Sequence, residues 1–196
     1  MEEDRRTMLA AAGAALLAAG AAGEARAQDE AAPYVPPARP ANVPEGRPGD
    51  FDFLSGEWRI HHRWRSGPES TEWLEFEGEA TVVGILGGIC SVEELRIPVR
   101  NFYGMGLRVL DQQNKVWHDH WVNKNSGVVT APGQLGGFAN GSGAWSSDWT
   151  DENGVSWIAE GIWDQIAPNS TRWRQRASND GGATWEETWI MHWTRA

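Results

Sequence analysis

Three histidines are the residues of this sequence whose type and spacing could do chemistry. His118 and His120 stand two apart in a β-rich run, so a strand would project both imidazoles from one face. Such a His-x-His pair supplies two ligands to a divalent metal ion, with a third ligand from a neighbouring strand, for which His62 is the candidate. His62, His118 and His120 could instead carry acid–base catalysis near neutral pH, in isomerase, lyase or hydrolase chemistry.

The neighbours of the histidine pair leave a second interpretation open. Trp117 and Trp121 occupy the opposite face of the same run, and two tryptophans are more typical of a core than two histidines. In that case His118 and His120 face solvent, and only His62 remains in the interior. A core histidine that is hydrogen-bonded to the backbone is the structural alternative for His62.

Strands, rather than helices, must position these side chains. From residue 51 onward, short β-rich runs are separated by Gly, Asn, Asp and Pro, and no helical period extends over ten residues. We expect strands near 57–65, 71–84, 90–98, 103–111, 116–123, 134–149, 156–166, 171–178 and 185–195. About eight to ten strands with short connections favour an all-β, antiparallel up-and-down barrel, whose closure removes the sheet edges. A two-sheet sandwich is the main alternative.

Alternation within the runs predicts which side chains face the interior. In the run 171–178, three arginines oppose Trp173 and Gln175, which places one polar residue inside. In the run 103–111, three apolar residues share a face, and Arg108 is therefore expected to point outward. The predicted ligand-binding residues are Trp58, His62, Trp64, Trp121, Trp173, Gln175, Trp189 and Met191.

Tryptophan dominates the composition, because all 13 tryptophans follow residue 51. An indole fills a core but needs a partner for its N–H, so this number indicates a wide, aromatic-lined interior. A core that is merely rich in tryptophan is the alternative. The expected function is binding of a small hydrophobic or aromatic molecule, oriented by His62 and Gln175. No cofactor is predicted, although a divalent metal ion at His118 and His120, or haem on one histidine, remains an alternative.

Charge and cysteine content narrow the classes of partner. The net charge of −10 at pH 7 repels phosphate backbones, which argues against nucleic-acid binding. The single cysteine, Cys90, permits no internal disulfide and lies in an apolar stretch where it would be buried.

The first fifty residues divide into two segments. Arg5 and Arg6 precede an alanine-rich run that ends in Ala25-Arg26-Ala27, so residues 1–27 predict a twin-arginine-like export signal. The protein would then be periplasmic or secreted, with no stable membrane insertion after cleavage; a retained membrane anchor is the alternative. Six prolines predict a disordered linker over 28–50, which leaves 51–196 as the barrel domain.

A turn motif joins the last two runs. Residues 178–185 match S-x-D-x-G-x-T-W, the Asp-box turn known from sialidase propellers. Asp180 can accept hydrogen bonds from turn amides, and Gly181 and Gly182 tolerate positive φ. A single copy predicts a hairpin clamp and is no evidence of a glycosidase.

The two ends of the domain carry a family resemblance. Gly56-Glu57-Trp58 looks like the G-x-W signature of lipocalins, and the whole domain resembles a bacterial family of lipocalin-like (calycin-type) exported proteins. These open with F-D-F-x-x-G-x-W and close with D-G-G-x-T-W-E-x-x-W-x-M-x-x-x-R, here residues 51–58 and 180–195. The resemblance implies a barrel with a central cavity and Arg195 packed across Trp58. It implies no particular reaction. Relatives tend to have W-S-I-W-W where this chain has W-H-D-H-W at 117–121.

Overall fold

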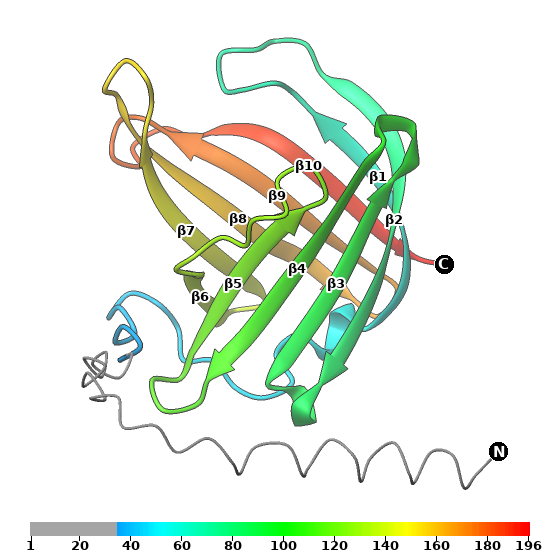
Figure 1. Cartoon of the computed structure of the whole chain (residues 1–196), viewed down its shortest axis with the longest axis vertical. Helices are drawn as coiled ribbons and strands as arrows, with labels where there is room; N and C mark the ends of the chain where they lie inside the picture. The colour runs from blue at the N-terminus through cyan, green and yellow to red at the C-terminus, as the bar shows by residue number, and fades with distance from the viewer. Residues whose placement is uncertain (1–34) are drawn as a thin grey trace, which may run out of the picture. The chain divides into compact units, whose positions relative to one another are not determined.

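The computed structural model describes residues 35–196 and shows a closed barrel of ten antiparallel strands (Figure 1). Each strand pairs with its neighbours in sequence, and the first pairs with the last, so the predicted up-and-down barrel is confirmed. The strands are β1 (Gly56–Trp64), β2 (Leu74–Ile85), β3 (Cys90–Ile97), β4 (Phe102–Asp111), β5 (Val116–Asn123), β6 (Gln134–Ala139), β7 (Ser142–Thr150), β8 (Ser156–Ala167), β9 (Ser170–Ser178) and β10 (Glu186–Arg195).

Only short 3-10 turns accompany these strands within residues 35–196: η1 (Asp52–Leu54), η2 (Leu86–Gly88) and η3 (Pro98–Arg100). Over the same range, no helix has the length and apolarity needed to cross a membrane. The predicted export signal and the first part of the predicted linker lie outside the described residues.

One predicted run proves to be a hairpin. The stretch 134–149 forms both β6 and β7, which are joined at Asn140 and Gly141. These two residues have φ of 53° and 76°, as the primed turns of two-residue hairpins require. The small residues on either side of the turn made the two strands look like one run.

The segment before β1 packs against the barrel instead of forming a linker throughout. The amide of Gly46 donates to the carbonyl of Lys115 at 2.8 Å, and Trp117 Nε1 donates to Asp50 Oδ2 at 3.0 Å. A Cβ on Gly46 would lie 2.7 Å from the Trp117 ring, so this glycine is required for the close approach. The compact unit therefore begins at Ala38, earlier than the predicted start at residue 51.

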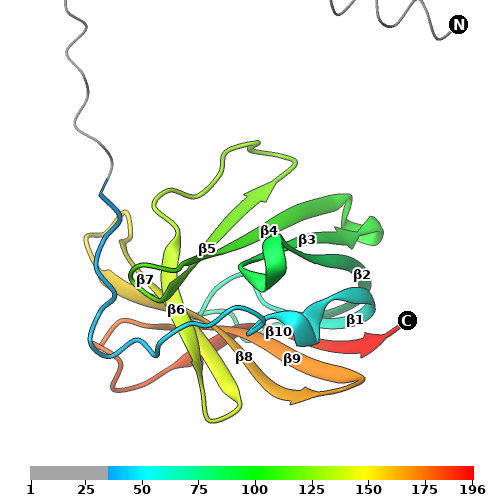
Figure 2. The ribbon, with the colours of Figure 1, turned by 90° about the horizontal axis from the view of Figure 1, so that it is seen from below.

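The segment before β1 crosses one end of the barrel (Figure 2). An aromatic cluster fills this end. The ring of Phe51 meets Trp117, Phe138 and Trp145 at centroid distances of 4.9, 5.0 and 5.3 Å. Trp193 joins Trp163 at 5.2 Å, in the edge-to-face arrangement that aromatic pairs prefer. This end is a packed core, and open space lies farther along the barrel.

The expected contact between Arg195 and Trp58 is present. The guanidinium carbon of Arg195 lies 4.0 Å from the Trp58 ring centroid. Its Nη2 donates to the Phe53 carbonyl at 2.6 Å, and its Nη1 donates to the Ser55 carbonyl. Gly56 has φ of 126°, and a Cβ there would lie 2.5 Å from Arg195 Nη1. The G-x-W pattern thus has a local physical cause, because the glycine makes room for the arginine that covers the tryptophan.

The turn between β9 and β10 is a hairpin clamp, as its motif predicts. Asp180 Oδ1 accepts from the Thr184 amide at 2.9 Å, and Asp180 Oδ2 accepts from the Thr184 hydroxyl at 2.7 Å. These hydrogen bonds lower the pKa of Asp180 to about 2. Gly181 and Gly182 both have positive φ, and Trp185 Nε1 donates to the Gly182 carbonyl at 3.0 Å.

Candidate functional site

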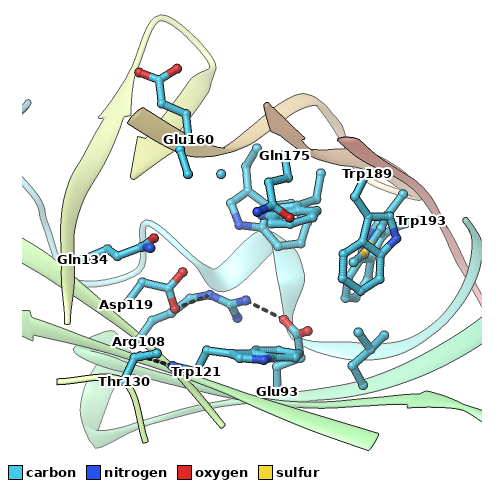
Figure 3. A pocket seen from close by; sticks show the side chains of 16 residues that line it. Glu93, Arg108, Asp119, Trp121, Thr130, Gln134, Glu160, Gln175, Trp189 and Trp193 are labelled. Carbon is cyan, nitrogen blue, oxygen red and sulfur yellow. Dashed lines mark hydrogen bonds and ion pairs between the residues drawn. The ribbon is translucent and has the colours of Figure 1, made fainter. Parts of the chain in front are cut away.

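A cavity of about 250 Å³ lies inside the barrel, above the aromatic cluster (Figure 3). Five of the eight predicted ligand-binding residues line it: Trp121, Trp173, Gln175, Trp189 and Met191. They come from β5, β9 and β10, where alternation turns every second side chain inward. The predicted inward placement of Gln175 is confirmed, since the arginines on either side of it form ion pairs with Asp164 and Glu160 outside the barrel.

The other three predicted ligand-binding residues are not part of the cavity wall. Trp58 is buried in the aromatic cluster beneath Arg195. Trp64 lies under Arg100, whose guanidinium carbon is 4.5 Å from the Trp64 ring centroid. His62 is completely buried behind the wall. Alternation predicted correctly that these three side chains point into the barrel. It could not predict their position along the barrel axis, which decides whether they reach the cavity.

His62 supports the wall from behind. Its Nδ1 accepts a hydrogen bond of 3.1 Å from Trp189 Nε1, and its ring stacks on Phe76 at a centroid distance of 5.0 Å. Burial lowers the pKa of His62 to about 3, with smaller contributions from His61 and Arg100 nearby. His62 is therefore a neutral residue that positions an indole, and the structure does not place it where a ligand in the cavity would touch it.

His118 and His120 face the outside of the barrel, because Asp119 and Trp121 of the same strand line the cavity. Their rings lie 6.4 Å apart, and His120 Nδ1 is 2.8 Å from the carbonyl oxygen of Thr130. Burial lowers the pKa of His118. The structure thus does not bring His62, His118 and His120 together for catalysis. Within residues 35–196, no three His, Cys, Asp or Glu side chains are grouped as metal ligands.

Arg108 faces the interior, and the prediction that it points outward is wrong. Gly104 and Gly106 share its inward face; Gly106 leaves room for the Arg108 side chain, and Gly104 leaves room for the Trp121 ring. A Cβ on Gly106 would lie 3.1 Å from Arg108 Nη2, and one on Gly104 would lie 2.2 Å from the Trp121 ring. The apolar residues between them lie half-buried on the outer face. The alternation of glycines was the sequence signal for this arrangement.

Arg108 forms a buried ion pair with Glu93, which no sequence pattern singled out. Arg108 Nη2 lies 2.5 Å from Glu93 Oε2, and the two side chains are only 5% and 4% exposed. The guanidinium carbon also lies 5.2 Å from the Phe51 ring centroid and 5.5 Å from that of Trp163. Arg108 is thus held between two rings of the aromatic cluster and the carboxylate of Glu93.

Asp119 is the second carboxylate of this group, and it is more loosely held. Its Oδ1 lies 3.8 Å from Arg108 Nε, which is longer than a hydrogen bond, and its side chain is 24% exposed. Figure 3 shows one carboxylate oxygen directed toward Arg108 and the other toward the cavity. Burial raises the pKa of Asp119 to about 6; Arg108 opposes this increase and Glu93 adds to it.

Comparison with known proteins gives no assignment. No family model matches this chain, and no curated protein matches it either. The lipocalin-like resemblance therefore stays a prediction, and function has to be inferred from the cavity itself.

Two amides complete the polar part of the wall. The side chains of Gln134 and Gln175 point into the space between Asp119 and the tryptophans (Figure 3). Gln134 Nε2 donates to the Ser147 hydroxyl at 2.9 Å, which fixes the orientation of its amide. Glu160 also borders the cavity, but its carboxylate points away. The site thus combines tryptophan side chains with one half-buried carboxylate and two amides.

Proposed function

We propose that this protein binds a small aromatic or apolar molecule inside its barrel. The observation that carries the proposal is the cavity inside the barrel, whose wall combines Trp121, Trp173 and Trp189 with Asp119 and Gln175. Ligand pockets are typically concave and mainly apolar, with a few polar groups that fix the orientation of the ligand. The aromatic cluster closes one end of the barrel beneath the cavity. On the wall, His62 accepts a hydrogen bond from Trp189 and holds that indole in place.

The size of the cavity limits the ligand. Its volume of about 250 Å³ is slightly below the roughly 300–1,000 Å³ that is usual for drug-sized ligands. A single ring with a short side chain, or a small fused ring system, matches this space. Stacking on an indole would add about 0.5–1.5 kcal/mol to the hydrophobic contribution.

The proposed setting is an exported, lipocalin-like protein. The arginine pair, the alanine-rich run and the Ala-x-Ala pattern support export to the periplasm or the medium. The contact of Arg195 with Trp58 supports the lipocalin-like assignment. N-terminal sequencing of protein from fractionated cells tests the export proposal; the expected mature start is Gln28, and an uncleaved cytoplasmic chain would contradict it.

A pair of matched substitutions tests binding in the cavity. Ala159 lines the cavity on β8, so Ala159→Phe would fill it, whereas Ala144 is exposed on the outer face of β7. Aromatic amines, alcohols and acids are titrated while tryptophan fluorescence is recorded. We expect saturable quenching that Ala159→Phe abolishes and Ala144→Phe preserves. Binding that is unchanged in Ala159→Phe would show that the ligand sits elsewhere, and the absence of any saturable binding would contradict the proposal.

Acid–base catalysis is a second candidate function, and one observation favours it. The pKa of Asp119, raised to about 6, leaves a carboxylate in the cavity that exchanges a proton near neutral pH. Asp119, and not the histidine pair, would then abstract a proton from carbon next to a carbonyl group of the ligand.

Deuterium exchange tests this candidate directly. Phenylacetone in D₂O would lose its α-proton signals faster with the wild-type protein than with Asp119→Asn. Asp148→Asn, which removes an exposed carboxylate on β7, is the matched control and should behave as wild type. Equal exchange with all three proteins would leave binding without catalysis.

A further inference from the structure

The charged groups of the cavity wall do not balance. Glu93 and Arg108 are in direct contact at 2.5 Å, so the charge of each is neutralised by the other. Asp119 is the carboxylate left over, at 3.8 Å from the same guanidinium. With all three groups ionised, these groups give the wall a net charge of −1 in a cavity lined largely by aromatic and apolar side chains. An uncompensated charge in such surroundings is unfavourable, and a ligand of opposite charge would relieve it.

Exposure decides which charged group a ligand meets. The Arg108 side chain is 5% exposed, and its Nε and Nη1 are buried without a hydrogen-bond acceptor within the described residues. The Asp119 side chain is 24% exposed and directs an oxygen into the cavity (Figure 3). A ligand in the cavity would therefore contact Asp119, while the burial of Arg108 leaves little of its guanidinium for a ligand carboxylate to reach.

The aromatic wall favours the same sign of charge. Trp121, Trp173 and Trp189 surround the space beside Asp119, and the face of an indole attracts a cation through its quadrupole. Cations are bound in proteins by this combination of ring faces with a nearby carboxylate. The side-chain oxygens of Gln134 and Gln175 add acceptors for the N–H groups of an ammonium.

From this arrangement we infer that the ligand is an organic cation: an aromatic or apolar body with a protonated amine, whose nitrogen lies against Asp119 and whose body lies against the tryptophans. The inference rests on the proposed binding function and names the chemical class of the ligand. Asp119 is thus a specificity-determining residue, and the Glu93–Arg108 pair positions it.

Binding of a cation should also depend on pH. Burial raises the pKa of Asp119 to about 6, so its carboxylate gains a proton as the solution becomes mildly acidic. The charged groups around it are Arg108 on β4, Glu93 on β3 and His120 on the outer face of its own strand. An amine should therefore bind more weakly as the pH falls from 7.5 to 5, while a neutral ligand of the same shape should be little affected.

Three probes with the same phenyl body separate the charge states: 2-phenylethylamine, 2-phenylethanol and 3-phenylpropionate. Calorimetric titration of the wild-type protein at pH 7.5 should give the amine about tenfold tighter binding than the alcohol, with the acid weakest. Asp119→Asn should reduce the affinity for the amine to that for the alcohol, and Asp148→Asn should leave the preference intact. Near-ultraviolet circular dichroism checks that each variant retains its packed tryptophans.

The possible outcomes distinguish this inference from the proposed function. Equal affinities for amine and alcohol would overturn the cation inference and leave the binding function in place. Tightest binding of the acid would also overturn it, and would assign recognition to Arg108. If none of the three probes binds, both the inference and the proposed function fail for this class of ligand. The pH dependence in the wild-type protein gives the same test without a substitution.

Discussion

Trp189 Nε1 donates a 3.1 Å hydrogen bond to His62 Nδ1, and this bond links the first strand of the barrel to its last. Because Nδ1 accepts, the proton of the neutral imidazole is on Nε2. The bond fixes the edge of an indole that lines the cavity. Phe76 stacks on the other face of the imidazole and keeps the ring in place.

Substitution of His62 tests this positioning role. His62→Phe keeps an aromatic ring of similar shape but leaves the buried Trp189 N–H without an acceptor, so we expect a loss of about 1–3 kcal/mol in the free energy of unfolding. His62→Gln can still accept a hydrogen bond and should lose less. Urea unfolding gives both values. A His62→Phe variant as stable as wild type would show that the hydrogen bond contributes nothing.

The buried imidazole also predicts acid sensitivity. The pKa of His62 is about 3 in the folded protein and near its ordinary value of 6.5 in the unfolded chain. The unfolded state therefore binds more protons below pH 6.5, and stability falls as the pH decreases from 6.5 toward 3. Between pH 7 and pH 4 the stability of wild type relative to His62→Gln should fall by about 3 kcal/mol. A constant difference would contradict the burial of a neutral histidine.

Asp119 should have the opposite effect on stability. Its pKa is raised to about 6 in the folded protein, against an ordinary value of 3.8, so the folded state binds the extra proton. The folded protein is disfavoured by the ionised carboxylate above pH 6 and loses this penalty as the pH falls toward 4. Asp119→Asn should be more stable than wild type by about 1–2 kcal/mol at pH 8, with the difference shrinking by pH 4. Urea unfolding at both pH values measures this difference in stability. If Asp119→Asn is less stable than wild type at pH 8, the ionised Asp119 carboxylate does not destabilise the folded protein.

Gly104 should control the shape of the cavity. A Cβ at this position would lie 2.2 Å from the Trp121 ring, so Gly104→Ala must displace that indole. We expect ligand affinity to fall by about tenfold or more, measured by calorimetry with 2-phenylethylamine. Gly67 has open space around its Cβ position, and Gly67→Ala should bind as wild type. Unchanged binding in Gly104→Ala would show that Trp121 does not contribute to the site.

The fold was predictable because, in most strands, apolar and polar side chains alternate and so indicate which face points into the barrel. Trp58 and Trp193 follow this pattern, and the turn at 178–185 carries its own hydrogen-bonding groups. The placement of Arg108 was not predictable in this way, since Gly104 and Gly106 leave Leu110 as the one buried apolar side chain on the inner face of β4. The three apolar residues that alternate with them lie on the outer face, so taking the apolar face of this strand as the inner one gave the wrong prediction.

The position of a residue along the barrel was the second limit. Alternation places Trp58, His62 and Trp189 on the inside alike, but only Trp189 borders the cavity. How far the aromatic cluster extends into the barrel depends on how Phe51 and the segment before β1 fill that end. Those contacts join residues far apart in sequence, and no local pattern encodes them.

Nuclear magnetic resonance of the indole N–H groups tests the central claim most directly. Each of the 13 tryptophans has one indole N–H, whose signal a single substitution would assign. On addition of 2-phenylethylamine we predict saturable shifts of Trp121, Trp173 and Trp189, which line the cavity, with no change at Trp185 in the outer hairpin. Shifts confined to Trp185 or other outer tryptophans, or none at saturating ligand, would contradict binding inside the barrel.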